Sequence, residues 1–136
     1  MYRDEPIGVE EHQAWFSSAM SDHEDHIHRL ALIQSAPSGV MSLTHIDRVS
    51  GVAEWGGYLA PQVTRGVGHG RQLLESSMAF ARDEVGLGRL IVEVLEINQS
   101  ALGLYRSMGF IEETRMSRAV VRDGQQVDAL RLTACL

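Results

Sequence analysis

Apolar residues recur along the chain with two different periods, and together they predict three helices and six strands. Helical spacing covers residues 7–20 and then residues 73–85, where Gly86 is the expected helix end. Asn98 is the expected cap of a third, shorter helix that continues through Ser107. Apolar runs bounded by turn residues predict strands at 26–34, 40–47, 52–59, 90–97, 110–121 and 127–136.

The order of these elements indicates an α/β fold, with a mixed, mostly antiparallel, twisted sheet and helices on both faces. Residues 52–97 form a β–α–β unit, whose two strands should pair in parallel through the crossover helix. The other strands should form antiparallel hairpins, with turns at residues 35–39 and at Asp123-Gly124. The pair Gly56-Gly57 inside one predicted strand indicates a bulge or a close backbone approach.

The composition predicts one domain over residues 1–136 with a modest core, because 44% of the residues are hydrophobic. No apolar run approaches the roughly 20 residues of a membrane span, and the polar, acidic start is unlike a secretion signal. The single cysteine, Cys135, excludes an internal disulfide framework, so a cytoplasmic protein is expected. A net charge of −6 without any lysine argues against a nucleic-acid surface, and no nucleic-acid or membrane partner is expected.

A cluster of glycines separates the third predicted strand from the helix that follows it. Glycines adopt positive φ and leave backbone N–H groups uncovered, so several of these groups can converge on one anion. A helix that begins there adds the positive end of its dipole. The pattern predicts a pyrophosphate cradle, although such a turn can also be simply tight. The residues of the cradle are Arg65, Gly66, Val67, Gly68, His69, Gly70 and Arg71.

Asn98, Ala101 and Tyr105 are spaced so that they share one face of the third predicted helix. On spacing alone, Asn98 is a helix cap and Tyr105 is a core aromatic residue. The same spacing also allows both side chains to line a binding site next to the cradle.

The two segments together resemble the GNAT acetyltransferases. The fixed positions of motif A of that family are filled by Arg65, Gly68 and Gly70, and those of motif B by Asn98, Ala101, Tyr105, Gly109 and Phe110. The resemblance implies the GNAT fold and an enzyme that uses acetyl-CoA, with its pyrophosphate on the cradle. It also implies that Asn98 and Ala101 line the thiol end of the cofactor and that Tyr105 protonates the departing thiolate.

Within the family, residues 10–16 and 51–61 resemble the aminosugar N-acetyltransferases of pseudaminic-acid synthesis. Those enzymes acetylate the C4 amine of a UDP-linked 4-amino-4,6-dideoxy sugar, so an aminosugar nucleotide is the expected substrate. Two alternatives stay open. One is an acetyltransferase for a protein N-terminus or another small amine, and the other is a catalytically silent acetyl-CoA-binding module.

Acetyl transfer to an amine needs a base for the substrate ammonium and donors for the developing oxyanion. Glu54 is the predicted base, acting through water, and Glu93 and His45 are the other candidates. Each of the three could instead be an ordinary strand residue. The predicted donors are the backbone N–H groups of Tyr58, Leu59 and Ala60.

A group of histidines at residues 23–28 is also compatible with a metal site. His26 and His28 would share one strand face, but the sequence indicates no fourth ligand. Acetyl transfer requires no metal, and none is expected.

Members of the family begin with a strand that this sequence lacks ahead of the first predicted helix. The strand at residues 26–34 should then be a sheet edge with unpaired N–H and C=O groups. We expect self-association to cover this edge, as a homodimer or a larger assembly.

Overall fold

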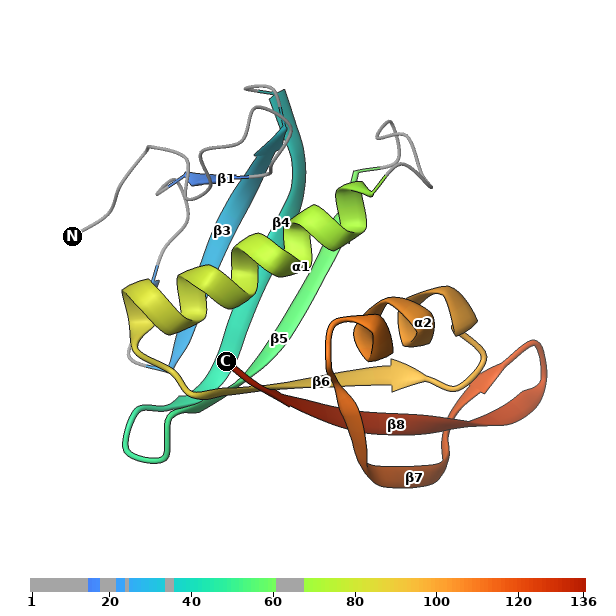
Figure 1. Ribbon diagram of the computed structural model, residues 1–136. Helices are drawn as coiled ribbons and strands as arrows, with labels where there is room; N and C mark the ends of the chain where they lie inside the picture. Colours follow the sequence, from blue (N-terminus) through green and yellow to red (C-terminus); the bar gives the residue numbers. More distant parts are fainter. Residues whose placement is uncertain (1–14, 18–21, 24, 34–35, 61–67) are drawn as a thin grey trace.

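The computed structural model of the chain describes residues 15–17, 22–23, 25–33, 36–60 and 68–136. Figure 1 shows a twisted sheet with helices packed against it. The strands are β1 (Trp15–Ser17), β2 (Asp22–His23), β3 (His26–Ile33), β4 (Ala36–Asp47), β5 (Val52–Leu59), β6 (Arg89–Leu95), β7 (Ile111–Arg122) and β8 (Gln125–Cys135). The helices are α1 (His69–Phe80), which a π-helical turn at Ala81–Val85 continues, and α2 (Gln99–Ser107). None of these described helices is long and apolar enough to cross a membrane.

The strands are ordered β1-β3-β4-β5-β6-β8-β7, and β2 is a further partner of β3. β5 and β6 pair in parallel, whereas the other neighbouring strands pair antiparallel. The predicted mixed, mostly antiparallel sheet and its parallel β–α–β unit are therefore confirmed. The last hairpin also turns at the predicted residues, because Asp123 and Gly124 have the positive φ values, 53° and 79°, of a two-residue hairpin turn.

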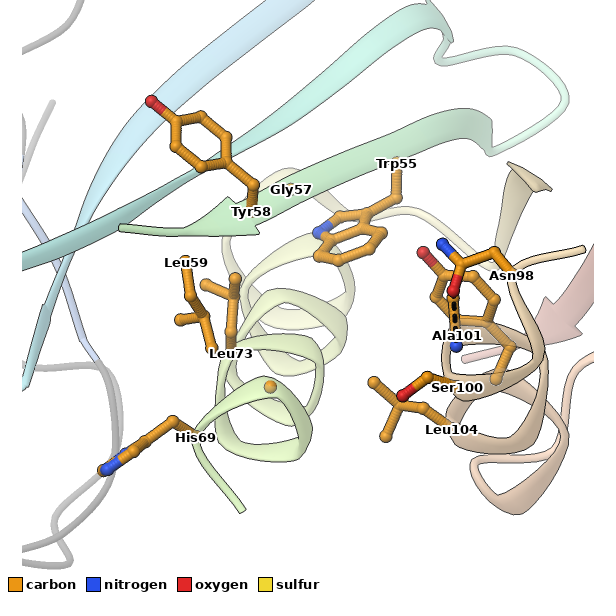
Figure 2. Close-up of a pocket in the computed structure, with 12 residues that line it drawn as sticks. Trp55, Gly57, Tyr58, Leu59, His69, Leu73, Asn98, Ser100, Ala101 and Leu104 are labelled. Atoms are coloured by element: carbon orange, nitrogen blue, oxygen red, sulfur yellow. Dashed lines mark hydrogen bonds between the residues drawn. The ribbon is translucent and has the colours of Figure 1, made fainter. Parts of the chain in front are cut away.

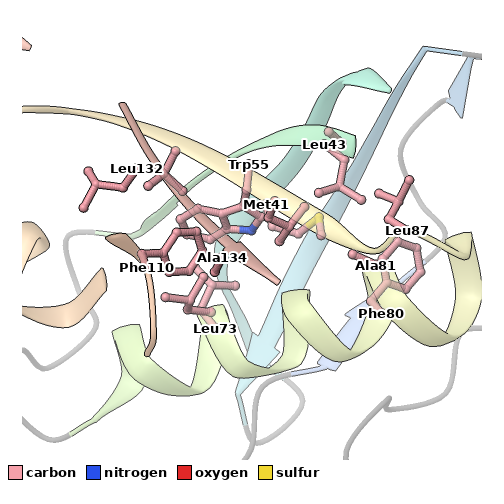
Figure 3. Close-up of a cluster of buried hydrophobic side chains, with 14 of the residues drawn as sticks. Met41, Leu43, Trp55, Leu73, Phe80, Ala81, Leu87, Phe110, Leu132 and Ala134 are labelled. Atoms are coloured by element: carbon pink, nitrogen blue, oxygen red, sulfur yellow. The ribbon is translucent and has the colours of Figure 1, made fainter. Parts of the chain in front are cut away.

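One cluster of buried apolar side chains lies between the sheet and both helices (Figure 3). It includes Phe80 from α1, Leu102 from α2, and Met41 and Leu132 from the strands. The crossovers β5–α1–β6 and β6–α2–β7 advance in the same direction across the sheet, and right-handed connections then place both helices on one face. The two described helices, α1 and α2, therefore share one face of the sheet.

The segment before β3 corrects two predictions. β1, which was expected inside a helix at residues 7–20, pairs antiparallel with residues 30–32, and the rest of that expected helix lies outside the described residues. β2 pairs with residues 26–27. Aromatic residues suit a strand, and the backbone groups along β3 offer hydrogen bonds that local helical periodicity does not outweigh. β3 is therefore not the uncovered edge that was expected, because β1 and β2 pair with parts of it.

The turn expected at residues 35–39 is also wrong in its later part, because β4 begins at Ala36. The two strands β4 and β5 approach each other closely here. A Cβ on Gly39 would lie 2.3 Å from the carbonyl oxygen of Tyr58, so only glycine fits at this position. The missing side chain lets the strand pairing extend through residues that are typical of a turn.

The pair Gly56-Gly57 does not form the expected bulge, since the β4–β5 register is regular from Gly39 to Thr44. The close approach is instead made by a side chain. A Cβ on Gly57 would lie 2.7 Å from the ring of Trp55. The glycine therefore makes room for an indole that lies against the strand.

β5 and β6 pair over a short length only, residues 52–54 with residues 89–91. Beyond this point the two strands diverge, and Figure 1 shows α1 beginning near the end of β5 while α2 follows β6. The divergence brings the ends of two strands and the starts of two helices around one space.

Candidate active site

A cleft of about 390 Å³ lies where β5 ends and the two helices start (Figure 2). β5 leads into α1 and β6 leads into α2, so the divergence of the two strands decides where the helices begin. Six residues that the sequence predicted to bind the cofactor line this cleft: Leu59, His69, Gly70, Asn98, Ala101 and Tyr105.

The backbone of β5 supplies part of the cleft wall. The N–H group of Ala60 donates to the carbonyl oxygen of Ser38 at 2.7 Å, so it is not available to a ligand as predicted. In an antiparallel ladder the hydrogen-bonding pairs alternate, and residues 57 and 59 therefore direct their backbone groups away from β4. Tyr58 and Ala60 direct their N–H groups toward β4. Of the three predicted donors, only the N–H of Leu59 is therefore on the side of β5 where β5 and β6 diverge.

The start of α1 leaves backbone N–H groups without partners inside the helix. Gly68 caps the helix with φ 90° and has no side chain that could cover the helix end. The N–H of Gln72 donates to the carbonyl of Gly68 at 2.9 Å, which leaves the N–H groups of residues 69–71 without an acceptor inside the helix. Arg65, Gly66 and Val67 lie outside the described residues. The structure therefore describes only residues 68–71 of the predicted cradle.

Arg71, one of the predicted cradle residues, links the two helices. Its Nη1 donates to Ser107 Oγ of α2 at 3.1 Å, and its Nε lies 3.7 Å from Glu75. His69 stands at the helix start with its Nδ1 3.4 Å from Gln72 Oε1. The arginine thus connects the first turn of α1 to the last turn of α2.

Asn98 has the capping role that was one of its two predicted roles, and it also lines the cleft. Its Oδ1 accepts a hydrogen bond from the N–H of Ala101 at 3.2 Å. The same residue thus caps α2 and forms part of the cleft wall.

The cap gives a measurable stability difference. Asn98→Ala should lower the free energy of unfolding by about 1 kcal/mol, the usual cost of a lost helix cap. Asn98→Asp keeps an oxygen acceptor and is the matched control, expected to lie within about 0.5 kcal/mol of the unchanged protein. Equilibrium urea unfolding measures both values, and equal stability of the alanine variant would contradict the capping role.

Tyr105 is held at the cleft by two aromatic neighbours. Its ring packs edge-on against Trp55, with centroids 6.1 Å apart, and lies 5.6 Å from the ring of Phe110. Burial raises the pKa of the Tyr105 phenol above its ordinary value of 10.0. The group therefore stays protonated across the neutral range, as the predicted proton donor must.

Glu54 lies on the other face of the sheet, because it precedes Trp55 in β5. One of its carboxylate oxygens pairs with His45 Nδ1, and the other accepts from Arg131 Nη2 at 3.0 Å. The same arginine nitrogen donates to Glu93 at 2.5 Å. These four side chains border a second hollow of about 520 Å³. The three candidate bases of the sequence are thus brought together.

Sequence reasoning missed Arg131. Its position depends on the register of β8 against β6, which sets Arg131 directly opposite Glu93. The only signal in the sequence was a charged residue between two leucines, Leu130 and Leu132, of the final predicted strand. His45 is placed by a local irregularity, since its φ is 50° and the β4–β5 register shifts after Thr44.

The described residues contain no group of three or more histidine, cysteine, aspartate or glutamate side chains arranged to hold a metal. The rings of His26 and His28 lie 5.2 Å apart, and Asp25 contacts His26 at 3.2 Å. The side chain of His23 lies outside the described part of the chain.

A comparison with protein families gives a match to the acetyltransferase (GNAT) domain over residues 1–111. A search of curated proteins gave no significant match.

Solved structures with the same fold include a probable acetyltransferase, with a TM-score of 0.71 at 21% identity over 82% of this chain and 63% of the other. The spermidine/spermine N-acetyltransferase of Vibrio cholerae gives a TM-score of 0.75 at 22% identity, over 82% and 66% of the two chains. A dodecameric structure of the spermidine N-acetyltransferase from that organism gives 0.76 at 21%, over 82% and 66%. The chain thus spans slightly less than two thirds of these proteins, and identities this low establish similarity of fold alone.

Proposed function

The chain belongs to the acetyltransferase (GNAT) family, and from this premise we propose that it transfers the acetyl group of acetyl-CoA to a primary amine of a small molecule. One observation carries the proposal. The adjacent residues Trp55 and Glu54 project to opposite faces of β5, one into a cleft and the other into an acidic hollow. A cofactor on one face and an amine on the other can then meet where β5 and β6 diverge.

The cofactor side is proposed to be the cleft. The N–H groups of residues 69–71, at the positive end of α1, would hold the pyrophosphate, and Arg65 and Arg71 would add charge. The pantetheine would run along residues 57 and 59 of β5 and past Asn98 and Ala101. The acetyl group would lie beside Tyr105.

The proposed reaction begins with the ammonium group of the substrate giving a proton to Glu54 through water. The amine nitrogen then attacks the thioester carbonyl carbon, and the new C–N bond forms as the carbonyl electrons move onto oxygen. When the C–S bond breaks, its electron pair leaves with sulfur, which takes the phenol proton of Tyr105. The nitrogen, positively charged since the attack, loses its second proton, which reaches the phenolate through water, and Glu54 releases its own proton to the solvent. The amide and coenzyme A are the products.

The charges on the acceptor side favour a cationic substrate. Two carboxylates, Glu54 and Glu93, face the hollow, and the cation between them, Arg131, is already hydrogen-bonded to both. A polyamine or another small amine with more than one positive charge suits this surface. An aminosugar nucleotide is the finer alternative, which rests on the resemblance of residues 10–16 and 51–61.

Self-association of this chain also stays a proposal. The sequence suggested self-association because β3 was expected to be an uncovered edge. That reason is weaker because β1 and β2 pair with that strand. One structural neighbour is described as dodecameric, a property of that protein. Light scattering on the purified chain measures the assembly directly.

The test of the function is release of free thiol from acetyl-CoA with a panel of acceptors: spermidine, a UDP-linked 4-amino sugar and a peptide with a free N-terminus. We expect turnover with spermidine. Turnover with the sugar nucleotide alone would support the finer alternative, and turnover with the peptide alone would contradict a small-molecule acceptor. Cofactor binding without turnover on any acceptor would contradict catalysis.

If Glu54 is the general base, replacing it should lower activity by an amount that depends on pH. Glu54→Gln should lower kcat/KM about 10²-fold at neutral pH, the low end for a lost general base. The deficit should shrink as the pH rises toward the ordinary amine pKa of about 10.4, because more substrate is then neutral in solution. Glu113→Gln, which changes another strand carboxylate paired with an arginine at 3.2 Å, is the matched control and should have no effect. A deficit that is constant with pH would contradict the base assignment.

A further inference from the structure

The indole nitrogen of Trp55 is buried and has no hydrogen-bond partner among the described residues. The whole side chain is only 7% exposed, so bulk water does not serve the donor. A buried donor without an acceptor costs about 1–3 kcal/mol. This cost makes Trp55 an unusual choice for a position where phenylalanine would fill similar space.

The same side chain lines the cleft. In Figure 2 the indole extends from β5 along the cleft, and its nitrogen is turned to the side on which Gly57, Leu59 and Leu73 lie. The absence of a side chain at Gly57 is what allows the ring to lie there, since a Cβ would come within 2.7 Å of it. The donor is therefore held in one orientation by its neighbours, next to apolar side chains.

The packing of the indole against Tyr105 places the donor near the residue proposed to give the proton. The two rings pack edge-on with centroids 6.1 Å apart. If Tyr105 gives its proton to the thioester sulfur, as the proposed function requires, then the acetyl group lies beside this aromatic pair. The carbonyl oxygen is separated from that sulfur by one carbon atom only.

We propose that the Nε1–H group of Trp55 donates a hydrogen bond to the carbonyl oxygen of the bound acetyl thioester. This inference rests on the proposed function and adds a side-chain donor to it. The bond satisfies the buried N–H and grows stronger as negative charge develops on the oxygen during attack by the amine. Apolar neighbours increase its strength because they exclude competing water. Coenzyme A without its acetyl group has no such oxygen and leaves the donor unpaired.

The experiment follows the indole N–H resonance of Trp55 by ¹⁵N-resolved NMR in the full chain. Trp15→Phe removes the resonance of the other tryptophan. The protein is titrated with acetyl-CoA and, separately, with coenzyme A. Backbone amides of residues 69–71 report cofactor binding, and the indole resonance reports the proposed bond. We expect the amides to respond to both ligands and the indole proton to move downfield with acetyl-CoA only.

Each of the other possible outcomes of the titration contradicts one specific part of the proposal. An indole resonance that stays fixed while the amides respond to acetyl-CoA would overturn this inference and leave the proposed function standing. Equal indole shifts with both ligands would overturn it too, because the acceptor would then belong to the coenzyme. Amides that respond to neither ligand would overturn the proposed cofactor site itself.

A variant gives an independent measure. Trp55→Phe keeps an aromatic ring and removes the donor, so the affinity for acetyl-CoA should fall roughly 5–10-fold, the value of one hydrogen bond, while the affinity for coenzyme A stays within about twofold. Titration calorimetry measures both. Equal losses for both ligands would indicate a packing role and overturn the proposal. The NMR titration retains Trp55 and decides the matter even where this variant folds poorly.

Discussion

Tyr105→Phe is expected to lower kcat about 10³-fold while the affinity for acetyl-CoA changes less than about twofold. The substitution keeps the ring that packs against Trp55 and Phe110, so the core should be preserved. It removes the phenol proton, which the departing thiolate takes in the proposed reaction. Because burial raises the pKa of this phenol, loss of the proton should not limit turnover until the pH is above about 10.

Single-turnover kinetics and titration calorimetry separate the two effects. Tyr58→Phe tests whether another phenol at the same cleft can serve, because Tyr58 also lines it but is 63% exposed, and its turnover should stay near normal. A Tyr105→Phe variant with near-normal turnover would return Tyr105 to a purely structural role. Equal losses of turnover and of cofactor affinity would show that the phenol binds the cofactor and does not serve as the acid.

Gly68→Val is expected to reduce the affinity for acetyl-CoA at least about 100-fold. Gly68 has φ 90°, a conformation that β-branched residues avoid at a cost of roughly 1–2 kcal/mol. The chain would relieve the strain by moving the first turn of α1, whose N–H groups are proposed to hold the pyrophosphate. Charge-assisted hydrogen bonds of roughly 1.5–3 kcal/mol each would be lost with them.

Gly86→Val provides the matched control for this variant. Gly86 ends the same helical segment with φ 84°, and neither glycine has another heavy atom within 4 Å of a built Cβ. The two variants therefore share the backbone strain, but only Gly68 lies at the proposed cradle. Calorimetry should show a large loss of cofactor affinity for Gly68→Val alone. Unchanged affinity in that variant would mean that the pyrophosphate binds elsewhere.

The features that could be predicted from the sequence are those that short-range chemistry decides. Gly86 stops a helical segment because it adopts positive φ, and Asn98 starts one because its side chain accepts from Ala101. The hairpin at Asp123 and Gly124 follows from the same kind of rule. The parallel pairing of β5 and β6 could also be expected, because a helix connects two apolar strands.

The features that could not be predicted depend on contacts between distant segments. β1 forms because β3 offers a partner, whereas the spacing of residues 7–20 along the sequence favours a helix. Arg131 reaches Glu54 only through the register of β8 on β6. Ala60 was expected to donate to a ligand, but its N–H is taken by Ser38, whose place in β4 depends on the absence of a side chain at Gly39. Spacing along the sequence contains none of this information.

The alternation of Glu54 and Trp55 along β5 has a consequence for the kinetic order of the proposed reaction. The coenzyme and the amine would approach from opposite faces, so neither has to leave before the other enters. A ternary complex can then form, and no covalent acyl-enzyme is needed. Cys135, the one cysteine of the sequence, is exposed at the end of β8 and does not line the cleft. Double-reciprocal plots at several fixed amine concentrations should therefore intersect, and the acetylated product can depart while coenzyme A is still bound.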